Sequence, residues 1–205
     1  MGIVFVILIH LIGIFILSAI IAFIGSIVTY FISRKERRKR KTFFIIVSPF
    51  IGLYTMYFVA LLGSIVLSGY KQIDIGIGDT WYVPLSNNCQ LLFIDAPELG
   101  FIEHDNQTVI SEVLQIQQMG NEVYGKTNQG KYFSYNTTDN KLREFSNEIE
   151  FNNAVANDKL ILKTAIDFYY KRRSDIAGIS QIVIGLVSLL SCILFVYLTR
   201  RIMLK

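Results

Sequence analysis

The charged residues of this chain are excluded from three long apolar runs, and this separation limits the possible folds more than any other feature. Residues 3–33 and 43–69 contain no Asp, Glu, Lys or Arg, and a third run covers 176–199. A helix that crosses the roughly 30 Å of hydrocarbon in a bilayer needs about 20 apolar residues. All three runs are long enough, so the sequence predicts an integral membrane protein with three spanning helices.

The segment between the second and third runs has the composition of a small soluble domain. Residues 70–175 hold fifteen of the sixteen acidic residues and ten of the twenty basic residues, so this segment is acidic. A segment of this length is enough for one modest hydrophobic core. The basic pI of about 9.0 comes from cations beside the apolar runs, which argues against a nucleic-acid partner.

The loop after the first run predicts the orientation. Seven of the eight residues 34–41 are Lys or Arg, and short loops with this charge stay cytoplasmic. Residues 70–175 and the N-terminus then lie outside, in a multi-pass protein of a bacterial cell (inner) membrane. Lys171, Arg172 and Arg173 argue weakly the other way, because they precede the third run on the outer side. The topology determinants are Arg34, Lys35, Arg37, Arg38, Lys39, Arg40 and Lys41.

These charges divide the chain into segments with definite boundaries. No basic residue precedes Arg34 and the first run is about twice too long for a signal peptide, so we interpret it as an uncleaved anchor. The expected segments are a first helix 1–33, a basic cytoplasmic loop 34–42, a second helix 43–69, an outer domain 70–175, a third helix 176–199 and a cytoplasmic tail 200–205.

Small residues recur at four-residue spacing within the runs. Side chains at this spacing share one helix face and allow a neighbouring helix to approach closely. We interpret the first such face as packing within the chain, with homodimerisation as the alternative. Pro49 has no N–H, which predicts a kink or a break near Ser48. The expected packing residues are Ser18, Ala22, Ser26, Ala60, Ser64 and Gly185.

The outer segment predicts an α+β domain with an antiparallel β-meander. Runs rich in Val, Ile, Tyr and Phe alternate with turn residues, and Gly120-Asn121 and Asn128-Gln129-Gly130 indicate hairpin turns. Residues 136–140 are expected to close the meander, and Trp81, Tyr82, Phe93 and Phe101 are assigned to the core. The sheet has about five expected strands, at 81–85, 90–95, 109–117, 122–126 and 131–135.

Two helices are expected after the sheet. Asn147 with Glu150 three residues later resembles a capping box, and it predicts a short helix over 148–156. Asp158 is the expected cap of a longer helix. Its apolar face repeats at Ile161, Ala165 and Phe168, and this helix is expected to continue into the third apolar run.

The sequence contains no motif for catalysis or for cofactor or metal binding. Glu103-His104-Asp105 is interpreted as a surface loop, because neighbouring residues on a strand point apart. His104 is the domain's only candidate base, and no nucleophile motif accompanies Ser111, Ser134 or Cys89. Cys89 and Cys192 are expected to be free thiols, and no catalytic site, metal or cofactor is predicted.

One resemblance is carried by Gly78–Leu85 (GDTWYVPL), Val109–Gln117, Asn121–Thr127 (NEVYGKT) and Gly130–Asn136 (GKYFSYN). Residues 78–136 thus resemble small uncharacterised bacterial extracytoplasmic β-meander domains. The resemblance implies a β-rich outer domain and brings no site residues.

The resulting expectation is a membrane-anchored interaction or binding protein that presents a small acidic outer domain. Its expected partners are membrane lipids together with a protein partner or a second copy of the chain. The alternatives are an immunity-type protein, an accessory subunit of a membrane complex, or a signal-input subunit. The absence of a catalytic motif from the sequence disfavours an enzyme.

Overall fold

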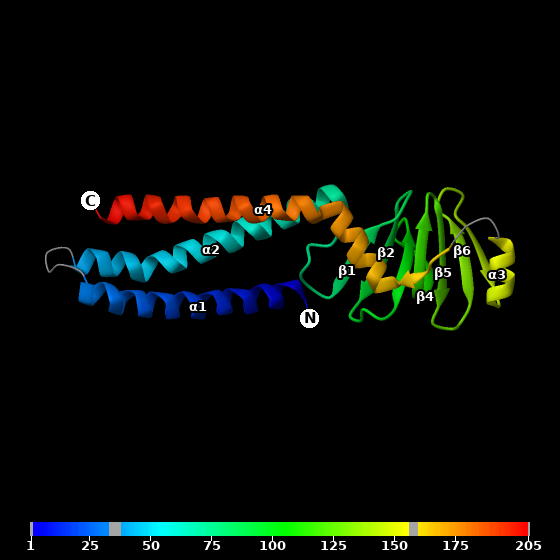
Figure 1. The fold of residues 1–205 in the computed structure, drawn as a ribbon, viewed down its shortest axis with the longest axis horizontal. Coiled ribbons are helices and arrows are strands. Elements are labelled where there is room, and N and C mark those ends of the chain that lie inside the picture. The colour runs from blue at the N-terminus through cyan, green and yellow to red at the C-terminus, as the bar shows by residue number, and fades with distance from the viewer. Residues whose placement is uncertain (1, 33–37, 156–159, 205) are drawn as a thin grey trace. The chain divides into compact units, whose positions relative to one another are not determined.

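The computed structural model describes residues 2–32, 38–155 and 160–204, which form two compact units (Figure 1). The first unit comprises Met1–Leu67 and Ile179–Lys205, and the second comprises Ser68–Gly178. Three helices are long and apolar enough to cross a membrane: α1 (Ile3–Ile32), α2 (Arg38–Lys71) and α4 (Ala165–Met203). Only 6%, 11% and 6% of their most apolar stretches is buried within the chain, so most of this apolar surface is exposed.

The first unit is held together by close approaches between small residues and larger side chains. Ser18 and Ala22 are the buried residues of α1, and Ser26 is half-buried, as are Ala60 and Ser64 on α2. A Cβ on Gly25 of α1 would lie 2.7 Å from the Ile45 side chain of α2. Gly185 differs from the other expected packing residues, because nothing lies within 4 Å of where its Cβ would be.

Helix α2 runs without interruption through Pro49, so the expected break is not present. Proline removes the N–H that would bond to the carbonyl of Ile45, four residues earlier. The Ser48 hydroxyl donates to this carbonyl at 3.4 Å, which partly satisfies the oxygen that Pro49 leaves without a donor. Serine side chains commonly accommodate proline in apolar helices in this way.

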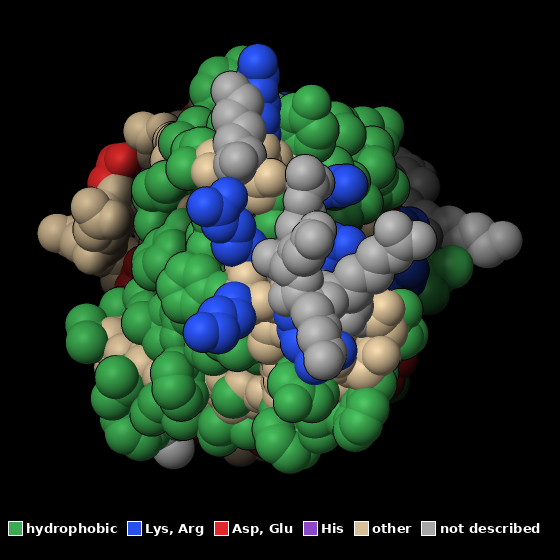
Figure 2. Space-filling view, turned by 90° about the vertical axis from the view of Figure 1, so that its left-hand side faces the viewer, with side chains coloured by type: hydrophobic (Ala, Val, Ile, Leu, Met, Phe, Trp, Pro, Cys, Tyr) green, Lys and Arg blue, Asp and Glu red, His purple; other side chains and the backbone are tan. Residues whose placement is uncertain are grey.

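Basic side chains gather at one end of the first unit (Figure 2), where α2 begins and α4 ends (Figure 1). Arg38–Lys41 begin α2, and Arg200 and Arg201 lie in the last turn of α4. The remaining topology determinants, Arg34, Lys35 and Arg37, lie outside the described residues. All cations of this unit therefore belong to two segments, 34–41 and 200–205.

The second unit is an eight-stranded antiparallel sheet with neighbouring strands joined in sequence order from β1 to β7. The five expected strands are confirmed, but three more are present. The missed strands are β3, β7 and β8, and β8 pairs with β4 beside the start of β3. The bounds are β1 Thr80–Pro84, β2 Cys89–Ile94, β3 Gly100–His104, β4 Gln107–Met119, β5 Glu122–Thr127, β6 Tyr132–Asn136, β7 Lys141–Phe145 and β8 Lys163–Thr164.

The loop expectations are partly confirmed. Gly120 and Gly130 have positive φ of 61° and 82° in the β4–β5 and β5–β6 turns, as hairpin connections require. Residues 136–140 do not close the meander, because they turn the chain from β6 into β7. The Asn136 side chain accepts hydrogen bonds from the N–H groups of Thr138 and Asp139 at 2.9 Å each, which fixes this turn.

The sheet carries an apolar core on each face. The main core combines inward residues of β1 to β6 with Ala165 and Tyr169 from the start of α4, and Phe93 is fully buried in it. The smaller core joins Tyr124 and Phe145 to Phe151 of α3 (Glu148–Ala154) on the opposite face. Trp81 packs against the main core. Tyr82 and Phe101 are half-buried, and their expected place in the core is wrong.

The two helix starts differ in how well the sequence predicts them. Asn147 caps α3, and its side chain accepts from the Glu150 N–H at 2.9 Å. Asp158 lies outside the described residues, and α4 begins only at Ala165. Residues 163–164 pair with β4 instead, so the helix expected around Ile161 is wrong at its start. Thr164 accepts from the Asp167 N–H at 3.2 Å and acts as the N-cap.

A buried carboxylate connects the segment after α2 to the start of α4. Asp74 is 3% exposed. The Tyr169 hydroxyl donates to it at 2.6 Å, and the Gly76 N–H donates at 2.7 Å. Arg173 Nε lies 3.4 Å from the same carboxylate. Burial, with the bond to Asp74, raises the pKa of Tyr169, which therefore stays a hydrogen-bond donor.

Strand β4 bends the sheet, and Gly125 opposite it has no room for a side chain. The pairing of β4 shifts register with both β3 and β5, and Glu112 of β4 has a positive φ of 56°. Bulges of this kind increase the local twist of a sheet. A Cβ on Gly125 would lie 2.5 Å from the Gln115 carbonyl and 2.3 Å from the Phe133 ring, so only glycine fits.

We expect Gly125→Ala to lower the free energy of unfolding of the domain by about 1–3 kcal/mol or more, because overpacking forces the backbone or Phe133 to move. The chain has a single tryptophan, Trp81, whose fluorescence reports unfolding of the domain in detergent. Gly69→Ala is the matched control, because nothing lies within 4 Å of its Cβ position. Equal unfolding midpoints for the two variants would contradict the packing described.

Candidate functional site

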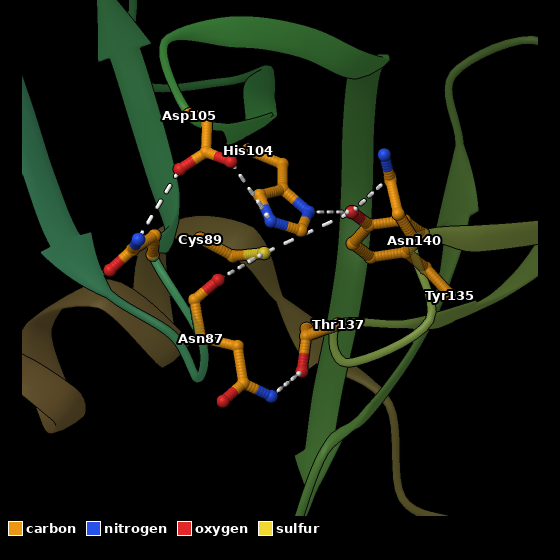
Figure 3. A network of polar contacts seen from close by, with 8 residues as sticks. Asn87, Cys89, His104, Asp105, Tyr135, Thr137 and Asn140 are labelled. Atoms are coloured by element: carbon orange, nitrogen blue, oxygen red, sulfur yellow. Dashed lines mark hydrogen bonds and ion pairs between the residues drawn. The ribbon is translucent and has the colours of Figure 1, made fainter.

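A network of polar side chains joins two distant parts of the curled sheet (Figure 3). Cys89 begins β2 and lies directly opposite His104 at the end of β3. Tyr135 belongs to β6, which lies four strands from β2 in the order of the sheet, and it is fully buried in the main core. Because the sheet curls around this core, the Tyr135 hydroxyl reaches both Cys89 and His104.

The Tyr135 hydroxyl is the centre of the network. It donates to Asn140 Oδ1 at 2.7 Å and lies 2.5 Å from His104 Nδ1. A hydroxyl has one proton to donate, so the contact with His104 requires a proton on Nδ1. His104 Nε2 lies 3.5 Å from Asp105 Oδ2. The imidazole therefore lies between the Tyr135 hydroxyl and the Asp105 carboxylate.

Cys89 is buried beside this hydroxyl and is not activated. Its sulfur lies 3.9 Å from Tyr135 Oη and 3.6 Å from the Asn87 carbonyl. Burial raises the pKa of the Cys89 thiol, and burial likewise raises the pKa of Tyr135. A nucleophilic cysteine requires a lowered pKa, so this arrangement keeps the thiol protonated. Both cysteines are free, as expected.

A second set of bonds extends the network to two turns. Asn87 lies in the β1–β2 connection with a positive φ of 55°. Its amide donates to Thr137 at 3.1 Å and to Thr138 at 2.9 Å, across 50 residues of sequence. Asn88 donates to Asp105 Oδ1 at 3.3 Å. The β1–β2 turn is therefore attached to the β3–β4 turn on one side and to the β6–β7 turn on the other.

An open cleft of about 590 Å³ lies beside the network. It is formed by the last turn of α2 and the side of β1 and β2 that faces away from the main core, where Tyr82 and the Ser68 hydroxyl are 3.3 Å apart. Amides, one carboxylate and a tyrosine provide its polar groups. The polar lining residues are Gln72, Thr80, Tyr82, Asn88, Gln90, Asp105 and Asn106.

A second open cleft of about 530 Å³ lies over β5 to β7 and the end of α3. It carries charges of both signs. Lys141 pairs with Asp139 at 3.8 Å and Glu122 accepts from Asn136 at 2.6 Å. Polar pairs of this kind also occur in the cleft beside β1 and β2, where Gln90 donates to Glu103 at 2.8 Å. The second cleft differs from it in carrying both cations and carboxylates.

The remaining sequence candidates are not brought together into a reactive site. The surface-loop interpretation of Glu103-His104-Asp105 is wrong for Glu103 and His104, which are half-buried residues of β3, and the His104 side chain is only 14% exposed. Asp95 and Glu98 are exposed in the β2–β3 connection. Within residues 2–32, 38–155 and 160–204, no group of three or more His, Cys, Asp or Glu side chains is placed to hold a metal ion.

Comparison of the chain with protein-family models, with curated proteins and with solved structures finds no match in any of the three. The resemblance of residues 78–136 to bacterial β-meander domains therefore stays a prediction.

We expect Tyr135→Phe to reduce the free energy of unfolding by about 1–3 kcal/mol, because it leaves Asn140 and His104 without a buried partner. Tyr132→Phe is the matched control. It removes a hydroxyl that donates to Glu148 at 3.2 Å on the exposed face, at an expected cost of at most about 0.5 kcal/mol. Denaturant unfolding followed by Trp81 fluorescence measures both, and equal costs would refute a structural role for the network.

Proposed function

We propose that this chain is a membrane-anchored binding protein that presents its acidic β-domain outside the cytoplasm and holds a polar ligand in the cleft beside β1 and β2. The observation that carries the proposal is this cleft, in which amide, hydroxyl and carboxylate groups surround the Tyr82 ring. Sites of this composition bind ligands that offer several hydroxyl or amide groups, because each polar group needs a partner and the ring packs against an apolar face.

The anchoring part of the proposal rests on the two ends of the domain. Its first residues end the apolar helix α2, and its last residues belong to α4, which continues into the third apolar run. A domain attached through two apolar helices stays at the membrane surface. A binding role suits this arrangement, since the ligand is then retained close to the bilayer.

The outward orientation is supported by the charges of the first unit. Arg38–Lys41 begin α2 and Arg200 and Arg201 end α4, and these two helix ends lie at the same end of the unit (Figure 1). If this end faces the cytoplasm, both basic segments obey the preference of Lys and Arg for that side. The domain, which is joined to the opposite ends of α2 and α4, then lies outside.

A binding role is also favoured over catalysis by the chemistry of the network. Cys89, the only cysteine of the domain, contacts Tyr135 and the Asn87 carbonyl, neither of which removes its proton. The network thus serves to hold the turns beside the cleft in place. It fixes Asn88 and Asp105, which both line the cleft.

The ligand site is tested by photocrosslinking in intact cells of the source organism. A benzophenone amino acid at Thr80, inside the cleft, is expected to form an adduct on irradiation. The same group at Thr108, an exposed strand residue outside the cleft, should not. Thr80→Tyr in a second experiment fills the cleft and is expected to abolish protection of the domain by the identified ligand. Equal adduct formation at the two positions would contradict the proposed site.

The orientation has its own test, in a Cys89→Ser, Cys192→Ser background. We expect a cysteine at Asn128, an exposed turn residue, to react with a membrane-impermeant maleimide in intact cells. A cysteine at Lys39 should react only after the cells are opened, because it is expected in the cytoplasm. The reverse pattern would move the domain to the cytoplasm and refute the outward orientation.

A further inference from the structure

A third cleft of the domain has a charge opposite to that of its surroundings. It measures about 360 Å³ and lies between the end of β4, the segment before α4 and one side of α4. Lys163, Lys171 and Arg172 line it with a single carboxylate, Asp175. The rest of 70–175 holds seven basic residues against fourteen acidic ones. Three of the domain's cations are therefore gathered at one hollow on an acidic domain.

Arg172 is held in a fixed position within this cleft. It is half-buried, and its Nε donates to the Pro84 carbonyl at 3.2 Å. This bond orients the guanidinium and leaves its terminal nitrogens available to a ligand. Guanidinium groups held in this way suit phosphate oxygens, which accept two parallel hydrogen bonds. Lys163 and Lys171 are exposed and provide mobile point charges on the other sides of the cleft.

The position of these cations along the chain indicates where the phosphate comes from. Lys171 and Arg172 precede the apolar run at Ile176 by five and four residues of one continuous helix, α4. At 1.5 Å per residue this is about 6–8 Å along the helix axis. The headgroups of a bilayer lie next to the end of a membrane-crossing segment. Cations at this point are within reach of lipid phosphates, whichever side of the membrane the domain occupies.

The orientation of α4 gives a second reason to expect that Lys171 and Arg172 bind a ligand. Basic residues beside an apolar helix normally stay cytoplasmic, yet Lys171 and Arg172 lie at the end of α4 opposite to Arg200 and Arg201. Their positions oppose the charge distribution that orients the helix. A lipid contact accounts for cations at a place where topology alone disfavours them.

We propose that the cleft formed by Lys163, Lys171 and Arg172 binds a phosphate group, and that its ligand is the headgroup phosphate of an anionic phospholipid. The hydrophobic residues Ile161 and Phe168, which also line the cleft, provide an apolar wall beside the phosphate. The proposal is independent of the ligand site beside β1 and β2, since the two clefts share no lining residue.

The test is native mass spectrometry of the full chain in a non-ionic detergent, supplied with phosphatidylglycerol or phosphatidylcholine in turn. The variant is Lys163→Gln with Lys171→Gln. The control is Lys131→Gln with Lys141→Gln, which removes the same charge from exposed surface pairs with Glu144 and Asp139. Lipid bound at the basic loop 34–41 is the same in all three proteins and forms a constant background. Trp81 fluorescence verifies that each variant is folded.

We expect the wild type to retain the anionic lipid in preference to the zwitterionic one. The cleft variant should bind the anionic lipid about thirty-fold more weakly, as expected for two cations beside an anionic surface, and the control should match the wild type. A separate arm adds inorganic phosphate alone. If phosphate displaces the lipid and binds as tightly by itself, the cleft is a phosphate site with a soluble ligand, and the lipid assignment is wrong. Equal lipid retention by the cleft variant and the control overturns the proposal altogether.

Discussion

The stability of the domain depends on one buried carboxylate, Asp74, and on the three groups that bind its oxygens. Asp74 follows α2, yet its oxygens are held by Tyr169 and Arg173 of α4 and by the Gly76 N–H. A carboxylate with so little exposure costs several kcal/mol unless it is paired and hydrogen-bonded. These contacts therefore oblige the first and last segments of the domain to meet.

A second set of contacts, made by hydroxyl, amide, thiol and imidazole groups, joins strands and turns that are distant in the sequence. Tyr135 of β6 contacts His104 and Cys89. Asn87 in the β1–β2 turn donates to Thr137 and Thr138 in the β6–β7 turn. A buried network of this kind adds specificity only when its members satisfy one another. The contacts of Asp74 and those of Tyr135 and Asn87 thus join segments that surround the main core. The β1–β2 cleft and the basic cleft are open surfaces beside this core.

The sequence predicts the parts of this fold that repeat a pattern, and it misses the parts set by distant contacts. The apolar runs, five strands and the cap at Asn147 follow from periodicity and local chemistry. Strand β7 is missed because four of its five residues are exposed, as befits a charged edge strand. Residues 163–164 pair with β4, which overrides their helical periodicity. The network around Tyr135 joins residues up to 51 positions apart, so no local sequence pattern predicts it.

The strand order has a consequence for how the domain is made. Each of the strands β1 to β7 pairs with its neighbour in sequence, so these pairings involve short loops and form early at little entropic cost. The bond from Tyr169 to Asp74 spans 95 residues and has to wait for the start of α4. During synthesis, the meander is thus assembled strand by strand, and the ribosome must reach the third apolar helix before the domain acquires its full stability.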